Sequence, residues 1–270
     1  MERSGSAEEG ENVKYYRFSI DDNIRVFRDL AQKPYTSIFE NDYLALLKSV
    51  HDRYGTKIQL NIYYAWEDFS LAQMPERYKE EWERVSDWLR LSFHAYSDDT
   101  RYTDSGYDTL YADCSLVHRQ IRRFAGERSL SYYTTLHYVA CPKAGVEALR
   151  DCGIKGLVGL YGSEEQPRIP YHLTAEVSAF MRENCFYTDE ETGMRFLAND
   201  IVLNSHKAEE ILPILETKRD KPFVEVMIHE QYYHRDFWLY QPDFAEKLHI
   251  AMDYLTGQDY IPAFFEDILQ

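Results

Sequence analysis

The stretch YYRFSIDD, residues 15–22, alternates apolar and polar side chains and ends in two adjacent carboxylates. Because side chains of a β-strand point alternately to its two faces, this pattern predicts a strand with one apolar and one polar face. Its apolar face carries Tyr16, Phe18 and Ile20. Asp21 ends the polar face, and Asp22 follows it. On its own such a pair is better explained by a turn or a helix cap, so its meaning depends on the other strands.

Further segments show the same alternation of apolar and polar side chains. They are residues 57–64, 88–94, 129–138 and 223–229. In four of these five strands an ionisable residue ends the polar face: Asp21, His94, His137 and His229. In an α/β barrel one face of each strand points inward, and the C-terminal strand ends carry the active site. A polar barrel interior lowers stability, so its recurrence over several strands indicates a functional site.

The order of strands and helices predicts the fold class. Helical patterns cover residues 37–54, 75–87, 107–124 and 142–149, and a further strand is predicted at 155–161. Ser37 is the expected cap of the first helix. Strands that alternate with helices favour βαβ units and a parallel sheet. We therefore expect an α/β fold, a TIM-like (β/α) barrel.

Residues 163–205 interrupt this alternation. Two apolar-alternating runs flank a turn at residues 190–193, which predicts a β-hairpin insertion near residues 185–205. The predicted domain organisation is a flexible N-terminal segment at residues 1–14, followed by a single barrel domain over residues 15–270.

The composition narrows the function classes. The chain has 270 residues, a formal net charge of -16 and 44% hydrophobic residues, so it can bury a large core. Because the surface is acidic, we expect neither nucleic-acid nor membrane partners. The N-terminus lacks an apolar signal region, which predicts a cytoplasmic protein, and no oligomeric state is indicated. The 23 tyrosines suit sugar-ring stacking as well as core packing. The four cysteines show no zinc-ribbon spacing and are expected to be reduced, buried thiols.

Adjacent carboxylates and histidines from neighbouring strands can form a divalent-metal site. Carboxylate oxygen and imidazole nitrogen suit zinc, manganese, iron or cobalt. Such an ion activates a water molecule and polarises a carbonyl group. The second carboxylate of the pair can take a proton as general base, and His229 can return one as general acid.

The motif FSIDD, residues 18–22, resembles the Thr-Phe-Asp-Asp motif of polysaccharide deacetylases of the NodB-homology group, carbohydrate esterase family 4. The resemblance implies an irregular seven-stranded deacetylase-type barrel. It also implies that Asp21 is the catalytic base and that Asp22 is a metal ligand. MIH, residues 227–229, resembles the family's Leu-x-His motif, which makes His229 the catalytic acid.

The second motif of that family is His-Ser/Thr-x-x-His, and HAYSD at residues 94–98 stands in its place. The resemblance makes His94 a metal ligand, with Asp98 in the position of the second histidine. The expected metal ligands are therefore Asp22, His94 and Asp98. The third motif is partly matched by HYVACPKAGVEALRDCG, residues 137–153, without its arginine, and the fourth motif, Asp-x-x-Asp-Trp, has no counterpart. This pattern is typical of a divergent member.

Residues beyond the strand ends complete the predicted site. The expected substrate-binding residues are His137, Arg101, Tyr102, Trp66 and Glu230. Arg101 and Tyr102 follow the strand of His94, and Trp66 follows the second strand, where its ring can stack on a sugar. Plain loop packing explains each of these side chains equally well.

Three functional hypotheses follow. The leading one is a divalent-metal-dependent hydrolase of carbohydrate metabolism, a polysaccharide deacetylase-like amide hydrolase acting on an N-acylated sugar or a related amide. Zinc is the expected metal, with manganese, iron, cobalt and nickel as alternatives. The second hypothesis is a catalytically inactive carbohydrate-binding barrel, motivated by the altered and missing motifs. The third is a metal-free glycosidase that pairs Asp21 with Glu225 or Glu230.

Overall fold

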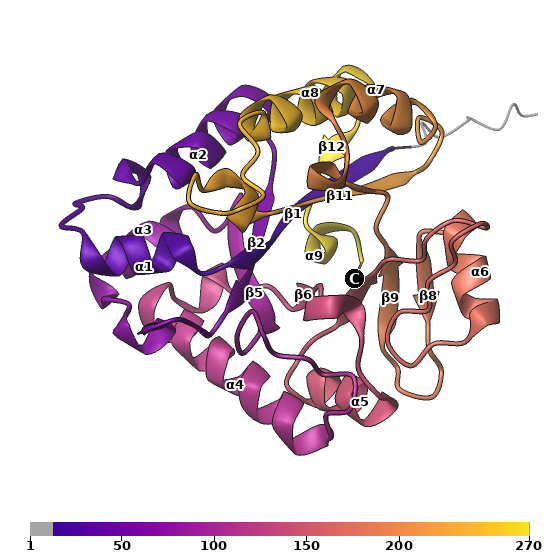
Figure 1. Ribbon diagram of the computed structural model, residues 1–270, viewed down its shortest axis with the longest axis horizontal. Coiled ribbons are helices and arrows are strands. Elements are labelled where there is room, and N and C mark those ends of the chain that lie inside the picture. The colour runs from indigo at the N-terminus through magenta and orange to yellow at the C-terminus, as the bar shows by residue number, and fades with distance from the viewer. Residues whose placement is uncertain (1–12, 270) are drawn as a thin grey trace, which may run out of the picture.

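Parallel strands form the centre of the protein in a computed structural model that describes residues 13–269 (Figure 1). The strands are β1 (Tyr15–Asn23), β2 (Ile58–Tyr63), β3 (Ala65–Trp66), β4 (Phe69–Ser70), β5 (Leu89–Ala95), β6 (Tyr133–Thr134), β7 (Gly156–Gly159), β8 (Phe186–Thr188), β9 (Arg195–Ala198), β10 (Ile201–Val202), β11 (Phe223–His229) and β12 (Ile261–Pro262). One sheet has the order β10-β11-β1-β2-β5, with β12 beside β1, and a second has the order β6-β7-β9-β8. Within these two sheets every pair except β8–β9 is parallel.

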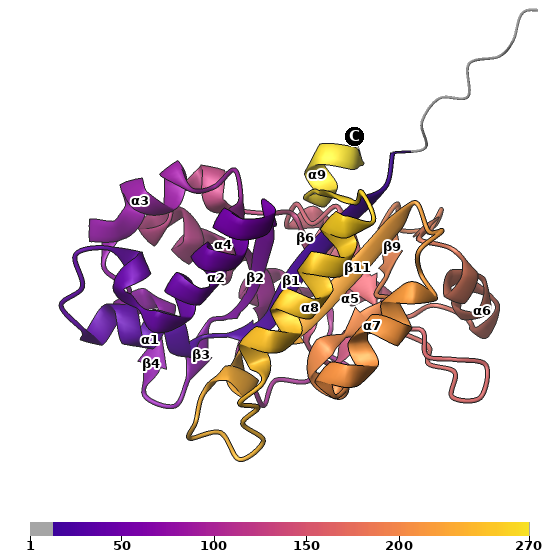
Figure 2. The same cartoon turned by 90° about the horizontal axis from the view of Figure 1, so that it is seen from above.

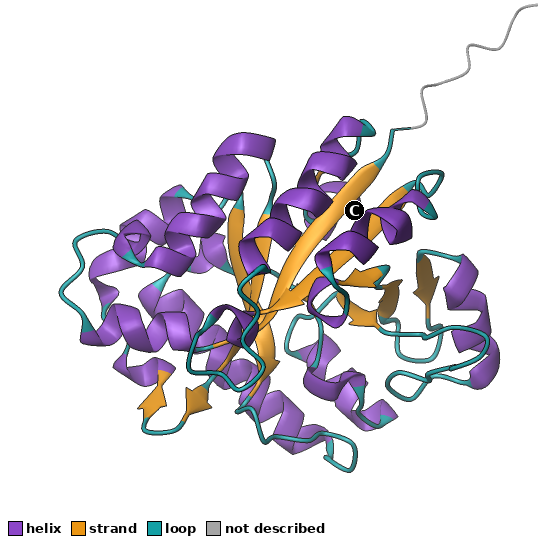
Figure 3. Ribbon diagram, turned by 45° about the horizontal axis from the view of Figure 1, so that its top comes forward, coloured by secondary structure: helices purple, strands orange, loops and turns teal. Residues whose placement is uncertain are grey.

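Helices lie around the outside of these strands (Figure 3). They are α1 (Arg25–Gln32), α2 (Asp42–Tyr54), α3 (Lys79–Arg84), α4 (Tyr107–Phe124), α5 (Lys143–Asp151), α6 (Ala175–Glu183), α7 (Ala208–Glu216), α8 (Phe244–Gly257) and α9 (Phe265–Ile268). Figure 2 shows α1, α2 and α3 to one side of β1 and β11, and α6 and α7 to the other. Most of the apolar side chains between helices and strands belong to one continuous core.

The predicted parallel α/β architecture is confirmed, whereas a closed barrel is not. The two sheets meet at an isolated parallel bridge between Leu91 and Leu130. On the other side, the backbone N–H of Asp200 donates to the carbonyl of Glu225 at 3.0 Å. These contacts bring the sheets together without a continuous ladder of hydrogen bonds.

The predicted strand at residues 129–138 is mostly irregular, and only β6 belongs to a ladder. The hydroxyl of Thr134 donates to the backbone carbonyl of Phe93, so a side chain takes the place of a ladder hydrogen bond. Tyr138 and Val139 have φ angles of 60° and 55°, which an extended strand does not accommodate. The alternation of side chains therefore predicted a strand at this position but made it too long.

The predicted β-hairpin near residues 185–205 is confirmed as the antiparallel pair β8 and β9. Gly193, with a φ angle of 70°, supplies the left-handed conformation of its turn. The hairpin is more than an insertion, because β9 also pairs in parallel with β7.

Helix starts and the chain ends add smaller corrections. Ser37 caps a short 3₁₀ turn, and Asn41 caps α2 by accepting from the backbone of Leu44 at 3.1 Å. The predicted flexible segment 1–14 lies outside the described residues except for its last two positions. Within residues 13–269 no helix is long and apolar enough to cross a membrane.

Polar side chains of β1 and β11 lie between the two sheets, as the alternation predicted, next to an apolar cluster of Tyr133, Val158, Leu197, Phe223, Met227 and Phe265. The guanidinium of Arg17 forms an ion pair with Glu225, and both side chains are fully buried. Ser19 also donates to Glu225, at 3.0 Å. Below this pair, the ring of Phe265 in α9 lies 4.6 Å from the Arg17 guanidinium carbon, so α9 closes the end of the sheets at which the strands begin.

The buried ion pair generates a stability prediction. We expect Glu225→Met to lower the free energy of unfolding by about 3–5 kcal/mol, because Arg17 would remain buried without a counter-charge. The double variant Arg17→Met/Glu225→Met should be more stable than either single variant. Urea unfolding followed by tryptophan fluorescence measures both effects.

Asp236→Ala is the matched control, because Asp236 pairs with Arg25 but is 71% exposed. We expect this change to cost less than about 1 kcal/mol. Equal destabilisation by Glu225→Met and Asp236→Ala would contradict the assigned role of the buried pair.

Candidate functional site

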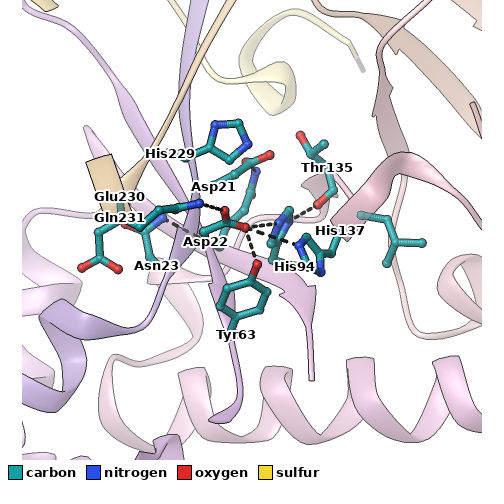
Figure 4. A network of polar contacts seen from close by, with 12 residues as sticks. Asp21, Asp22, Asn23, Tyr63, His94, Thr135, His137, His229, Glu230 and Gln231 are labelled. Carbon is teal, nitrogen blue, oxygen red and sulfur yellow. Dashed lines mark hydrogen bonds and ion pairs between the residues drawn. The ribbon is translucent and has the colours of Figure 1, made fainter. Parts of the chain in front are cut away.

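One extra residue at the end of β1 brings both aspartates into the interior. Ile20 pairs with Leu60 and Asn23 with Ile62, so two β1 residues lie opposite the single residue Asn61. This irregularity is a β-bulge, which redirects side chains and occurs often beside active sites. Asp22 has a φ angle of 64°, an uncommon conformation for a residue other than glycine. Figure 4 shows both carboxylates in the same polar network.

Asp22 is the centre of that network. Its Oδ1 atom accepts from the Tyr63 hydroxyl and lies 3.0 Å from His94 Nε2, and its Oδ2 accepts from Gln231 Nε2 at 2.6 Å. Burial alone would raise the pKa of Asp22, but the hydrogen bond from His94 and the charges of His229, His94 and His137 hold that pKa well below its usual range. Asp22 is therefore a carboxylate in the folded protein.

His94 and His137 face Asp22 in the same way. In each ring Nδ1 lies at a backbone carbonyl, that of Thr135 at 2.5 Å and that of Thr100 at 3.2 Å. A ring that donates through Nδ1 turns Nε2 to the interior, where the distances to Asp22 Oδ1 are 3.0 Å and 3.9 Å. Ligand atoms of Asp22, His94 and His137 all lie within 4.8 Å of one another.

The pKa values of the two rings differ. Burial and the neighbouring His94 lower the pKa of His137 to about 4, so this ring is neutral at pH 7. Burial alone would also lower the pKa of His94, but the charges of Asp21 and Asp22 and the hydrogen bond that His94 donates to Asp22 raise it instead. A neutral imidazole is the form that binds metals.

Asp98, the expected third ligand, does not belong to this group of close ligand atoms, and His137 takes its place. After β5 the chain makes a turn in which the backbone of Thr100 donates to the carbonyl of Ser97 at 3.2 Å. This turn leaves Asp98 exposed instead of placing it beside His94. The geometry thus brings His137, rather than Asp98, to Asp22 and His94, and a ligand role for Asp98 stays a prediction.

Asp21 and His229 lie opposite each other on the parallel strands β1 and β11. Asn61 donates to Asp21 Oδ1 at 2.6 Å, and burial raises the pKa of Asp21. Asn204 Oδ1 lies 2.8 Å from His229 Nδ1, which leaves His229 Nε2 available to a ligand. The two side chains can therefore exchange protons with a molecule bound between them.

These residues line a cleft with a volume of about 970 Å³. Its walls carry four buried polar atoms with no hydrogen-bond partner among the described residues: Thr135 Oγ1, Tyr161 Oη, Asn199 Nδ2 and Gln231 Oε1. Leaving a buried polar atom without a partner costs about 1–3 kcal/mol. The walls of the cleft therefore contain buried polar groups whose hydrogen-bonding capacity is not satisfied within the described residues.

Three predicted substrate-binding residues have structural roles instead. Tyr102 is fully buried, and its hydroxyl donates to Asp113 at 2.9 Å. Trp66 lies beneath the guanidinium groups of Arg25 and Arg28, at 4.4 Å and 4.2 Å from its ring centre. Neither ring lines the cleft described above.

Glu230 is the third correction, because its carboxylate holds the start of α1. It is fully buried and accepts from the backbone N–H groups of Ile24 and Val26 at 2.7 Å and of Arg25 at 3.1 Å. No side chain next to α1 caps that helix, so a residue about two hundred positions away does so. Arg101 differs from these three: it lies 4.2 Å from the ring centre of Tyr138, which lines the cleft.

Sequence analysis missed four residues of the network. Tyr63 ends the polar face of a predicted strand, so the alternation could have singled it out. The other three residues make contacts with residues distant in sequence, which no local sequence pattern predicts: Asn204, Thr135 and Gln231.

No protein-family model and no curated protein matches this sequence. Solved structures do resemble it. The Xyl-CE4 domain of a multidomain xylanase from the hindgut metagenome of Trinervitermes trinervoides has a TM-score of 0.52 at 9% identity, over 94% of this chain and 89% of that chain. A family 4 acetyl xylan esterase from Clostridium thermocellum, in complex with a cobalt ion, has a TM-score of 0.54 at 12% identity, over the same shares.

A 4-alpha-glucanotransferase from Thermococcus litoralis has a TM-score of 0.59 at 10% identity, over 94% of this chain but 40% of that chain. The predicted resemblance to family 4 carbohydrate esterases is thus confirmed for the fold. Because a glucanotransferase shares this fold, the fold alone does not decide the reaction.

The role of Glu230 generates a second prediction. We expect Glu230→Gln to lower the free energy of unfolding by about 1–3 kcal/mol, because the amide loses the charge and one acceptor that serve three backbone donors. Thermal unfolding followed by circular dichroism measures this loss. Glu191→Gln is the control, because Glu191 is 71% exposed and pairs with Lys143. A Glu230→Gln variant as stable as Glu191→Gln would show that the cap is dispensable.

Proposed function

We propose that this protein is a divalent-metal-dependent hydrolase that removes an acyl group from an N-acylated sugar or a related amide. One observation carries the proposal: Asp22, His94 and His137 converge beside Asp21 and His229 in a single polar cleft. The proposal includes one distorted seven-stranded barrel formed by both sheets, within a single domain over residues 15–270.

The residues at Asp22 fit a divalent cation. One carboxylate oxygen and two imidazole nitrogens form a common donor set for catalytic zinc, and cobalt and manganese suit the same donors. The carbonyls of Thr135 and Thr100 fix the histidine rings, and Tyr63 and Gln231 hold the carboxylate. Such outer partners are usual around metal ligands. Zinc is our first choice, with cobalt, manganese, iron and nickel as alternatives.

The proposed reaction assigns a proton transfer to each of two side chains. A bound divalent ion supplies Lewis acidity, which activates water and polarises the acyl carbonyl. Asp21 takes the proton of the attacking water, because Asn61 holds one of its oxygens and leaves the other free. His229, oriented by Asn204, gives a proton to the departing amine. Tyr63 and Gln231 keep Asp22 ionised and oriented throughout.

The polar lining of the cleft supports a hydroxyl-rich substrate. Besides the residues around Asp22, the cleft is lined by Ser163, Gln166 and Asn204, whose side chains carry hydrogen-bond donors and acceptors. Sugars present many hydroxyl groups that can pair with such atoms. Two of the similar structures are a domain of a xylanase and an acetyl xylan esterase, and both names agree with a carbohydrate substrate.

The metal-free glycosidase hypothesis is disfavoured by the carboxylates it needs. Glu225 is paired with Arg17, and Glu230 caps α1, so neither is available to act with Asp21. The catalytically inactive binding barrel remains the alternative, and it predicts sugar binding without acyl release.

Metal binding generates the third prediction. We expect His137→Ala to weaken zinc affinity by more than about 100-fold, whereas Asp98→Ala should change it less than about 10-fold. Isothermal titration of the metal-free protein with zinc measures both. A larger loss in Asp98→Ala than in His137→Ala would restore the set of ligands expected from the sequence.

Catalysis generates the fourth prediction. We expect Asp21→Asn to lower kcat by about 10²- to 10⁴-fold while zinc remains bound, because the amide cannot take the proton of the attacking water. Acetate release from a panel of N- and O-acetylated sugars is the assay, with Asp98→Asn as the matched control. Sugar binding with no acetate release by the zinc-loaded wild type would favour the inactive barrel.

A further inference from the structure

A second cluster of metal-binding side chains lies between two helices. Cys114 and His118 belong to α4, and Cys152 follows α5 directly. Cys114 Sγ lies 3.7 Å from His118 Nε2, and Cys152 Sγ lies 3.6 Å from His118 Nδ1. Ligand atoms of all three residues lie within 4.8 Å of one another. The cleft is lined by other residues, so this cluster is separate from the candidate active site.

Helix geometry explains the convergence of the three side chains. Residues four positions apart lie on the same face of an α-helix, so Cys114 and His118 point in the same direction from α4. That face packs on α5, whose C-terminal end presents Cys152. Cys114 and His118 are almost fully buried, whereas Cys152 is partly exposed. The cluster is therefore enclosed by protein on one side and open to solvent at Cys152.

We propose that Cys114, His118 and Cys152 bind a zinc ion that joins α4 to α5. The 3.6 Å between Cys152 Sγ and His118 Nδ1 suits two ligands on one tetrahedral zinc, because zinc–sulfur and zinc–nitrogen bonds are about 2.3 Å and 2.0 Å long. Cys114 supplies the third ligand, since one ligand atom of each of the three residues lies within 4.8 Å of the other two. The ring of His118 binds through one nitrogen, and a water molecule at the open side completes four ligands. Binding releases the thiol protons to solvent.

The segment between α4 and α5, whose two ends such an ion would join, includes part of the candidate active site. Between α4 and α5 the chain passes through β6, a strand of two residues, and through Thr135 and His137. Few ladder hydrogen bonds hold this irregular segment. A metal link between positions 114 and 152 closes the loop around it and lowers the entropy of its unfolded forms. The second ion would thus stabilise the segment that carries His137.

Cobalt substitution tests the proposal through a signal that only thiolate ligands produce. The metal-free chain, reduced with a phosphine, is titrated with Co²⁺ while absorption is recorded. We expect a near-ultraviolet thiolate-to-cobalt charge-transfer band in the wild type. Cys152→Ser should lose this band, and Cys185→Ser, the matched control on a half-buried cysteine outside the cluster, should keep it. This absorption band is independent of the candidate active site, since neither Asp22 nor the histidines beside it contribute sulfur.

Two further measurements decide the matter if Cys152→Ser fails to fold. In the wild type, added zinc should protect a pair of thiols from a thiol-reactive dye. In His94→Ala, whose active-site ligand is missing, added zinc should still raise the melting temperature. Absence of the cobalt band in the reduced wild type would overturn the proposal. So would its persistence in Cys152→Ser.

Discussion

The extra residue in β1 is the constraint on which the candidate site depends. Regular alternation would send Asp21 and Asp22 to opposite faces of the strand, one inward and one toward the helices. The bulge turns both inward, and the left-handed conformation of Asp22 is the strain that accompanies it. The hydrogen bonds from Tyr63 and Gln231 and the interaction with His94 offset this strain, so the same contacts fix the backbone and the carboxylate.

The ends of β1 and β11 are also locked to each other beyond the ladder. Glu230 binds the backbone that leaves β1, and Gln231, the next residue, binds Asp22. Adjacent residues therefore serve stability and site geometry at once. Substitution of either residue would therefore disturb the end of β1, even though Glu230 does not line the cleft.

Sequence patterns predicted the parallel strands, the polar interior and the positions of Asp21, Asp22, His94 and His229. Local alternation carries that information, because each strand was identified from its own residues. It could not predict the bulge, the short turn that exposes Asp98, or the choice of His137 over it, since these depend on contacts between β1, β2 and the segment after β6. Glu230 and Asn204 lie far in sequence from the groups they bind, and nothing in their surroundings announces those partners.

The position of α9 has a consequence for how the molecule is made. It follows every strand of the two sheets in the chain, yet it covers the end of the sheets where Arg17 and Glu225 pair. During synthesis the strands leave the ribosome before the residue that shields their polar interior. Docking of α9 is therefore the step that shields the Arg17–Glu225 pair, and it closes the end of the sheets opposite to the cleft.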